Sequence, residues 1–306
     1  KQFLEAKRRE RPGFMKLDDY KAYEMLNIMR DGHPTLAAIM NFGIYPQGYL
    51  PQCAIIAVVS PGREIGEVSN KGERFLDNKR IEGNISSMVQ EALLFCKRNM
   101  KTQTVVDPIT GNRTDETEYP MLALREAILN ALIHRDYSIY SEGTAVQINI
   151  FYDRIEIHSP GNLYGRMTVE QLGIARPDLR NPALAMIAEW ETEAENRYSG
   201  IPTMRREMAA YGLPEPVFEN RRNEFVVTFY NESAGADTMS TKAEHKKGGE
   251  ETLLSFCRTP RSRSEIMEFL HISTWFYTND KYVRPLLKEG KLRMTIPDKP
   301  KSKKQR

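Results

Sequence analysis

The 306-residue sequence has few cysteines and no long apolar run, and both shortages narrow its possible functions. Its three cysteines, Cys53, Cys96 and Cys257, lie far apart and form no Cys-x-x-Cys pair, so neither a disulfide framework nor a zinc site is indicated. The longest purely apolar segment, residues 53–59 (CAIIAVV), is far too short to cross a bilayer. We therefore expect a protein of the reducing cytoplasm, with no signal peptide and no membrane partner.

Two catalytic signatures are also absent. No Gly-x4-Gly-Lys-[Ser/Thr] segment occurs, which excludes a P-loop and leaves no motor motif for a helicase. No His-Glu-x-x-His or other clustered metal-ligand signature is present, so a zinc hydrolase is not indicated.

Charge is distributed unevenly along the chain, although the net charge is only +3. Residues 241–306 contain 16 Lys and Arg against 8 Asp and Glu, whereas residues 1–240 are mildly acidic. A basic C-terminal segment favours a polyanionic partner. The alternative is a solvated basic tail, which is the simpler interpretation of residues 299–306 (KPKSKKQR).

Apolar periodicity predicts both helices and strands in the body of the chain. Residues 231–249 have almost no large apolar side chain and are typical of a linker. The predicted elements are helices to about residue 30 and from residue 34, a buried strand at 53–60, a helix after residue 85, an exposed loop near 107–118, a helix from residue 120, a hairpin at 143–161 that turns at 152–153, helices at 182–195 and 200–212, and a strand at 223–230.

The helix that begins at Pro120 carries a polar stripe within the segment LREAILNALIHRDYS. At 100° per residue Glu126, Asn130 and His134 lie along one face, while most of the circumference is apolar. A helix that is apolar nearly all round is buried, and buried polar groups need partners. The three side chains either satisfy one another and nearby backbone, or face a cavity that a ligand completes.

Neighbouring segments relate the stripe to a known fold. The helix EAILNAL, followed by a hairpin that ends in SPG, resembles the GHKL-type (Bergerat) ATP-binding fold of histidine kinases, gyrase B, Hsp90 and MutL. More closely, the segments ALREAILNALIHRDYS, DRIEIHSPGNL, RNPALA, NRYSGIPTMRREMAAYGLPEPVFE and FVVTF together resemble a bacterial and archaeal family of RecG-like or Schlafen/AlbA-domain transcriptional regulators. This resemblance runs from about residue 20 to the C-terminus.

The resemblance implies a site for ATP and Mg²⁺. Asn130 would hold Mg²⁺ on the phosphates, an oxygen-ligand role that suits a hard cation. Glu126 would act as general base toward water if ATP is hydrolysed. The YSGI segment would approach the phosphates through backbone N–H groups at a helix start. The implied nucleotide-binding residues are Asn130, His134, Ser159, Gly161, Ser199 and Gly200.

Two positions depart from the GHKL pattern. Ser159 stands where these proteins place an aspartate on the adenine amino group, and a hydroxyl accepts that hydrogen bond more weakly than a carboxylate. Tyr198 stands where the first glycine of the second glycine box is expected. Arg135 and Asp136 either line the site or pair to close the helix end. Asn181 is expected to cap the helix that follows it.

The basic C-terminal segment has the plan of a winged helix-turn-helix. Residues 250–258, 263–270 and about 274–288 are expected to form three helices, followed by a strand and a basic hairpin as the wing. The recognition helix of such a domain enters the major groove of DNA. Winged helices also mediate protein contacts, which is the alternative. We expect base contacts from Ser273, Thr274, Tyr277, Thr278 and Lys281, and phosphate contacts from Arg261, Arg263, Arg284, Lys299 and Lys301.

These observations predict an α+β fold. Residues 1–112 would be the end of an AlbA-type α+β domain with its connector, 113–232 a GHKL-like α/β sandwich, 233–249 a linker and 250–306 the winged helix. The leading hypothesis is a transcriptional regulator that binds double-stranded DNA and couples this to nucleotide binding; it allows a homo-oligomer. The alternatives are a slow Mg²⁺-dependent ATPase acting on nucleic acid, and a degenerate GHKL scaffold that serves only assembly.

Overall fold

The chain divides into two compact units, Lys1–Ser233 and Ala234–Arg306. The boundary expected near residue 112 lies inside the first unit, because strands from both sides of it share one sheet. The computed structural model describes residues 1–106, 111, 113–141, 143–176, 178–192, 199–231, 253, 256–269, 283–288, 291–293 and 295.

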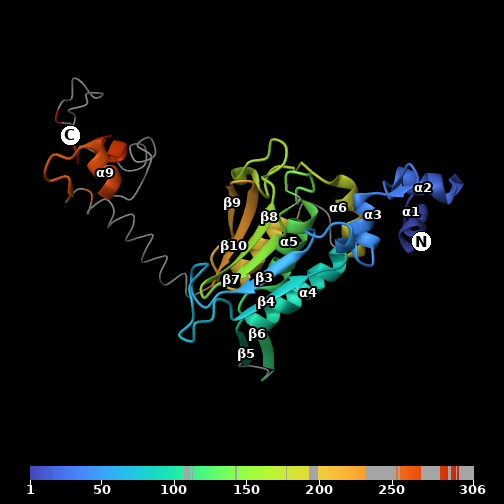
Figure 1. Ribbon diagram of the computed structural model, residues 1–306, viewed down its shortest axis with the longest axis horizontal. Coiled ribbons are helices and arrows are strands. Elements are labelled where there is room, and N and C mark those ends of the chain that lie inside the picture. Colours follow the sequence, from blue (N-terminus) through green and yellow to red (C-terminus); the bar gives the residue numbers. More distant parts are fainter. Residues whose placement is uncertain are drawn as a thin grey trace. The chain divides into compact units, whose positions relative to one another are not determined.

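A six-stranded mixed sheet organises the first unit (Figure 1). The strand order is β4-β3-β7-β8-β10-β9, in which β3 and β7 are parallel and the other neighbours antiparallel. The predicted strand at 53–60, the hairpin and the last strand are confirmed as β3, β7–β8 and β10, although only alternate residues of β3 are buried. The strands are β3 (Ile55–Val59), β4 (Asp77–Ile81), β7 (Val146–Ile150), β8 (Arg154–Pro160), β9 (Val217–Arg221) and β10 (Glu224–Tyr230).

Helices cover one face of this sheet and bury the main core. Ile148, Ile155 and Ile157 project from β7 and β8 into the core cluster that also contains the apolar sides of α4 and α5. An α+β fold with a mixed sheet is thereby confirmed. The helices of this layer and its surroundings are α3 (Leu36–Phe42), α4 (Ile85–Asn99), α5 (Met121–Ile133), α6 (Pro182–Glu191) and α7 (Gly200–Ala210), with a short 3-10 turn, η3, at Val169–Gln171.

The N-terminal segments differ in detail from the sequence prediction. The first predicted helix ends earlier, because α2 (Asp19–Met25) is followed by a small hairpin of β1 (Met29–Arg30) and β2 (His33–Pro34). Positive φ values at Asn27, Asp31 and Gly32 reverse the chain there. The remaining elements before α3 and β3 are α1 (Gln2–Glu10), η1 (Pro12–Lys16) and η2 (Pro46–Gly48).

A second hairpin occupies much of the stretch where an exposed loop was predicted. Strands β5 (Thr102–Val106) and β6 (Arg113–Thr117) pair antiparallel and form a separate two-stranded sheet. The loop prediction was therefore wrong for residues 113–117, where polar side chains hid the strand.

The second unit has its own small core, in which Leu253, Ile266, Val283 and Leu286 are buried. Its described helices are α9 (Arg263–Phe269) and α11 (Arg284–Lys288). Ser262 and Glu265 form a capping box at the start of α9, since each side chain accepts a hydrogen bond from the other residue's backbone N–H. In the described part of the chain, no helix is both long and apolar enough to span a membrane.

Candidate functional site

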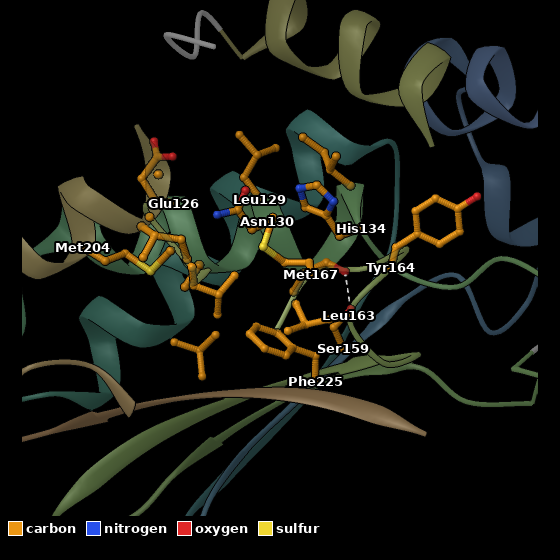
Figure 2. A pocket seen from close by; sticks show the side chains of 18 of the residues that line it. Glu126, Leu129, Asn130, His134, Ser159, Leu163, Tyr164, Met167, Met204 and Phe225 are labelled. Carbon is orange, nitrogen blue, oxygen red and sulfur yellow. Dashed lines mark hydrogen bonds between the residues drawn. The ribbon is translucent and has the colours of Figure 1, made fainter. Parts of the chain in front are cut away.

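The polar stripe of helix α5 faces a pocket. Its apolar residues, among them Leu124, Ile128 and Leu132, are buried in the main core. Glu126, Asn130 and His134 instead line a cavity of about 180 Å³ between α5, β8, β10 and the start of α7 (Figure 2). Within the described residues no hydrogen bond joins these three side chains to one another, so they do not form the internally satisfied network that was the alternative.

The pocket has an apolar part and an acidic part. The apolar lining comprises Leu129, Ile133, Ile157, Leu163, Met167, Leu172, Ile201, Met204, Phe225 and Val227. The charged lining residues are Glu126, Asp178 and Glu189, and the described lining contains no Lys or Arg. The cavity therefore suits a flat apolar group at one place and, near its carboxylates, a cation or a cation-bound anion.

Glu126 and Asn130 converge on the first residue of α7. A Cβ atom added to Gly200 would lie 2.9 Å from Asn130 Nδ2 and 3.2 Å from Glu126 Oε2, which is closer than ordinary side-chain contacts. The glycine thus permits the amino end of an eleven-residue helix to approach both polar groups. The amides of Gly200 and Ile201 have no acceptor within the helix and carry its positive dipole end, as an anion site requires.

The electrostatics of Glu126 are set by burial and by its neighbour Arg125. Burial raises the pKa of the Glu126 carboxyl, and Arg125, whose Nη1 lies 3.3 Å from Glu126 Oε1, acts in the opposite direction. Arg125 is itself held by a hydrogen bond from Nη2 to the carbonyl oxygen of Thr192 at the end of α6. The second carboxylate oxygen remains directed toward Gly200.

His134 enters the pocket as a neutral imidazole. Burial, together with the charge of Arg180, lowers the pKa of His134 to about 4. Figure 2 places its ring beside Asn130 and near Tyr164 and Met167. At neutral pH this side chain can therefore donate or accept hydrogen bonds, but it brings no positive charge to a ligand.

Ser159 and Gly161 line the pocket where β8 ends, and Ser159 also makes a hydrogen bond to α5. Its hydroxyl donates a 2.7 Å hydrogen bond to the carbonyl oxygen of Ala131 in the last turn of that helix. Gly161 has φ +97°, and a Cβ there would lie 2.6 Å from the Cβ of Asp136. The close packing of this corner onto the segment after α5 explains the glycine.

The segment after α5 is mainly structural. The Arg135 guanidinium is buried and donates to the carbonyl oxygens of Asp136, Ser141 and Thr144. The Asp136 carboxylate instead lies 3.2 Å from Arg180. Of the two alternatives for Arg135 and Asp136, the ion pair between their side chains is therefore not formed, and neither residue lines the pocket.

Asn181 was also expected in a different role. It precedes α6 but makes no side-chain capping bond to that helix. Its amide nitrogen donates 2.8 Å hydrogen bonds to the carbonyl oxygens of Ile133 and Arg135. These bonds supply donors for carbonyl groups at the C-terminal end of α5 that have no partner within the helix.

Several lining residues carried no signal in the sequence. Asp178 and Glu189 lie outside α5, so the helical periodicity that identified the polar stripe gives no information on them. Nothing in the sequence distinguishes Tyr164 and Phe225 from other aromatic residues. Asp178 also accepts a hydrogen bond from the backbone N–H of Arg166, which fixes the loop at the pocket rim. Only their shared position in the fold identifies them.

Of the predicted DNA contacts, only Arg261, Arg263 and Arg284 fall within the described residues. The Arg261 guanidinium lies 4.3 Å from the ring of Phe256, and its Nη1 is 3.7 Å from Glu265. Arg263 and Arg284 lie at the starts of α9 and α11. Ser273, Thr274, Tyr277, Thr278, Lys281, Lys299 and Lys301 lie outside the described residues, as does Tyr198 of the YSGI segment.

Two family models match parts of the chain. Residues 143–229, which include β7, β8, α7 and β10, match an HATPase-type model described as "Putative ATP-dependent DNA helicase recG C-terminal". Residues 251–306 match the C-terminal domain of the Fic-like protein named for filamentation induced by cAMP. No curated protein matches the chain.

A solved structure shares the fold. The DIP2311 protein from Corynebacterium diphtheriae matches with a TM-score of 0.52 and 21% identity over 90% of this chain. The match covers 55% of the DIP2311 chain, so the present chain spans about half of that protein's length. At this identity the similarity concerns the fold alone. The similarity to the RecG-like family rests on the match at residues 143–229.

Proposed function

We propose that the pocket binds ATP with Mg²⁺ in a GHKL-like manner. The observation that carries the proposal is the meeting of Asn130, Glu126 and the amino end of α7 at Gly200. The Asn130 amide lines the pocket and makes no hydrogen bond among the described residues, so its oxygen is available to a metal ion. Mg²⁺ commonly takes only one or two protein ligands and completes its shell with water and phosphate oxygens, which fits this arrangement.

The charge of the lining supports a metal-bound nucleotide over a free one. A free triphosphate would meet the carboxylates of Glu126, Asp178 and Glu189 without a compensating lysine or arginine in the described lining. Bound Mg²⁺ would reduce this repulsion, and the dipole of α7 would favour the remaining negative charge. The apolar part of the pocket, which includes Leu163 and Phe225, suits a purine ring.

Calorimetric titration with Mg²⁺-ATP tests the proposal. Wild type should release or absorb heat with a saturable profile, and Asn130→Ala should bind at least about tenfold more weakly because a metal ligand is lost. Asn78→Ala serves as the matched control, because Asn78 is exposed on β4 away from the pocket lining. An absence of heat with wild type would refute nucleotide binding.

We further propose that the second unit is a winged helix that binds duplex DNA, so that the chain is a nucleotide-responsive regulator. Its basic composition, its separate small core and the capped helix α9 support this proposal. With about five phosphate contacts, the logarithm of affinity should fall with that of salt at a slope of about −4 to −5. Deleting residues 241–306 should abolish binding, whereas full retention would refute the assignment.

A slow ATPase is the second candidate, and the position of Glu126 favours it. Its carboxylate lies beside Asn130 and has a raised pKa, which makes it a better proton acceptor than an ordinary glutamate once it is ionised. A scaffold that binds nothing is less well supported, because the polar stripe lines a cavity and lacks internal hydrogen bonds among the described residues.

A further inference from the structure

The β5–β6 hairpin extends away from the main sheet and from α4 (Figure 1). Its two strands pair only with each other among the described strands. Thr102, Gln103 and Thr104 are exposed on β5, as are Asp115 and Glu116 on β6. An isolated two-stranded ribbon is marginally stable in water, and added strands would stabilise it.

The two outer edges of this hairpin differ in charge. β6 carries Arg113, Asp115 and Glu116, whereas β5 (TQTVV) has no charged residue. Charged side chains are a common device that keeps edge strands from pairing with other chains. The edge of β5 lacks this protection.

The hydrogen-bond pattern shows which peptide groups of β5 remain available. The backbone N–H of Glu118 donates to the carbonyl oxygen of Lys101, immediately before the registered pair Thr102↔Thr117. Because antiparallel ladders alternate, the peptide groups of Gln103 and Val105 face β6. Those of Thr102, Thr104 and Val106 then face the outer edge.

We propose that β5 is a homodimer interface, in which two copies pair antiparallel about a two-fold axis at Thr104. This register places Thr104 opposite Thr104 of the second copy, and Thr102 opposite Val106. The residues whose peptide groups face outward therefore meet one another, and the sheet becomes four-stranded. Of the two outer edges, that of β5 suits pairing with a second copy better than that of β6, because β6 paired with β6 about Asp115 would set two carboxylates opposite each other.

Sedimentation of the full chain over a dilution series tests this interface with two matched variants. Thr104→Pro removes an outward N–H from β5, and Asp115→Pro removes the equivalent group from the outer edge of β6. The two variants lose the same side-chain bond, because Thr104 Oγ1 donates to Asp115 Oδ1 at 2.8 Å. Proline is tolerated at the solvent side of an edge strand.

Wild type and Asp115→Pro are expected to sediment as dimers. Thr104→Pro should raise the dissociation constant at least about tenfold, since the two-fold axis doubles each lost hydrogen bond. Thr104→Lys keeps the backbone N–H group but places two ammonium groups opposite each other across the two-fold axis. It should raise the dissociation constant by a similar factor. A monomeric wild type, a dimer unaffected by both Thr104 variants, or equal dissociation of Asp115→Pro would overturn the proposal.

Discussion

Gly200→Ala separates the folding of α7 from its proposed role at the nucleotide. The new Cβ would lie 2.9 Å from Asn130 Nδ2, so one of the two groups must move by a few tenths of an ångström. The atom it meets is the end of a side chain, and Gly200 has no positive φ that alanine would resist. The fold should therefore absorb the change, and the better helix propensity of alanine offsets its cost by up to about 1 kcal/mol.

Ligand binding should respond much more strongly than stability. Mg²⁺ demands nearly ideal geometry, so a displaced Asn130 oxygen cannot keep its place in the coordination shell. Displacing a group that orients a metal ligand typically costs about 10–100-fold in affinity, or about 1.4–2.8 kcal/mol. We expect this loss in a Mg²⁺-ATP titration, while the thermal midpoint without ligand stays within a few degrees of wild type.

Gly13→Ala is the matched control for this substitution. A Cβ at Gly13 meets nothing within 4 Å, and Gly13 lies in η1, outside the pocket lining. It should leave both affinity and stability unchanged. If Gly200→Ala binds Mg²⁺-ATP as tightly as Gly13→Ala does, the metal is not held beside Gly200 and the assignment of Asn130 is wrong.

Three further outcomes follow from the site. Glu126→Gln should lower any ATP hydrolysis by about 10²-fold or more; equal rates in a phosphate-release assay would remove Glu126 as the base. Burial lowers the pKa of His134 to about 4 from 6.5, so the folded protein binds a proton at this residue less readily than the unfolded chain does. The free energy of unfolding therefore contains a favourable contribution from the neutral imidazole that is complete above pH 6.5. That contribution, up to about 3 kcal/mol, is lost as pH falls from 6.5 to 4. In urea melts the free energy of unfolding of His134→Gln should fall less than that of wild type between pH 6.5 and 4. Identical pH profiles would contradict the conclusion that His134 is buried in its neutral form. Asn181→Ala should cost about 2–3 kcal/mol in the same assay, because the carbonyl oxygens of Ile133 and Arg135 lose their donor; a cost below about 0.5 kcal/mol would argue against this role.

The sequence predicted the local features of the site, but not the partners that complete it. Helical periodicity is enough to place Glu126, Asn130 and His134 on one face. It says nothing of Gly200, which lies 70 positions beyond Asn130 and reaches it only because α7 packs on α5. A single sequence gives no distance between these two residues. The resemblance to GHKL proteins implied that the YSGI segment and Asn130 share one site, and in the structure Gly200 lies beside Asn130.

The pairing of β3 with β7 was not predicted, for a related reason. Residues 55–59 are all apolar, although only Ile55, Ala57 and Val59 are buried, and a continuous apolar strand does not indicate which strand pairs with it. Its parallel pairing with β7 joins segments on both sides of residue 112. The predicted capping role of Asn181 was wrong because its side chain donates instead to carbonyl oxygens at the end of α5, which have no partner within that helix. The capping rule considers only residues close in sequence and cannot predict this contact.

The end of α5 also bears on which base the proposed site would accept. Ser159, Tyr137 and Asn181 donate to the carbonyl oxygens of Ala131, Leu132 and Ile133 in turn, so each side chain has a structural task. With its proton committed to Ala131, the Ser159 hydroxyl can only accept a further hydrogen bond. It can meet the exocyclic amine of adenine but has no donor for a carbonyl at the same place, as guanine would present. In the proposed site, a serine at the position where GHKL proteins have a carboxylate would therefore weaken the recognition of adenine without reversing it.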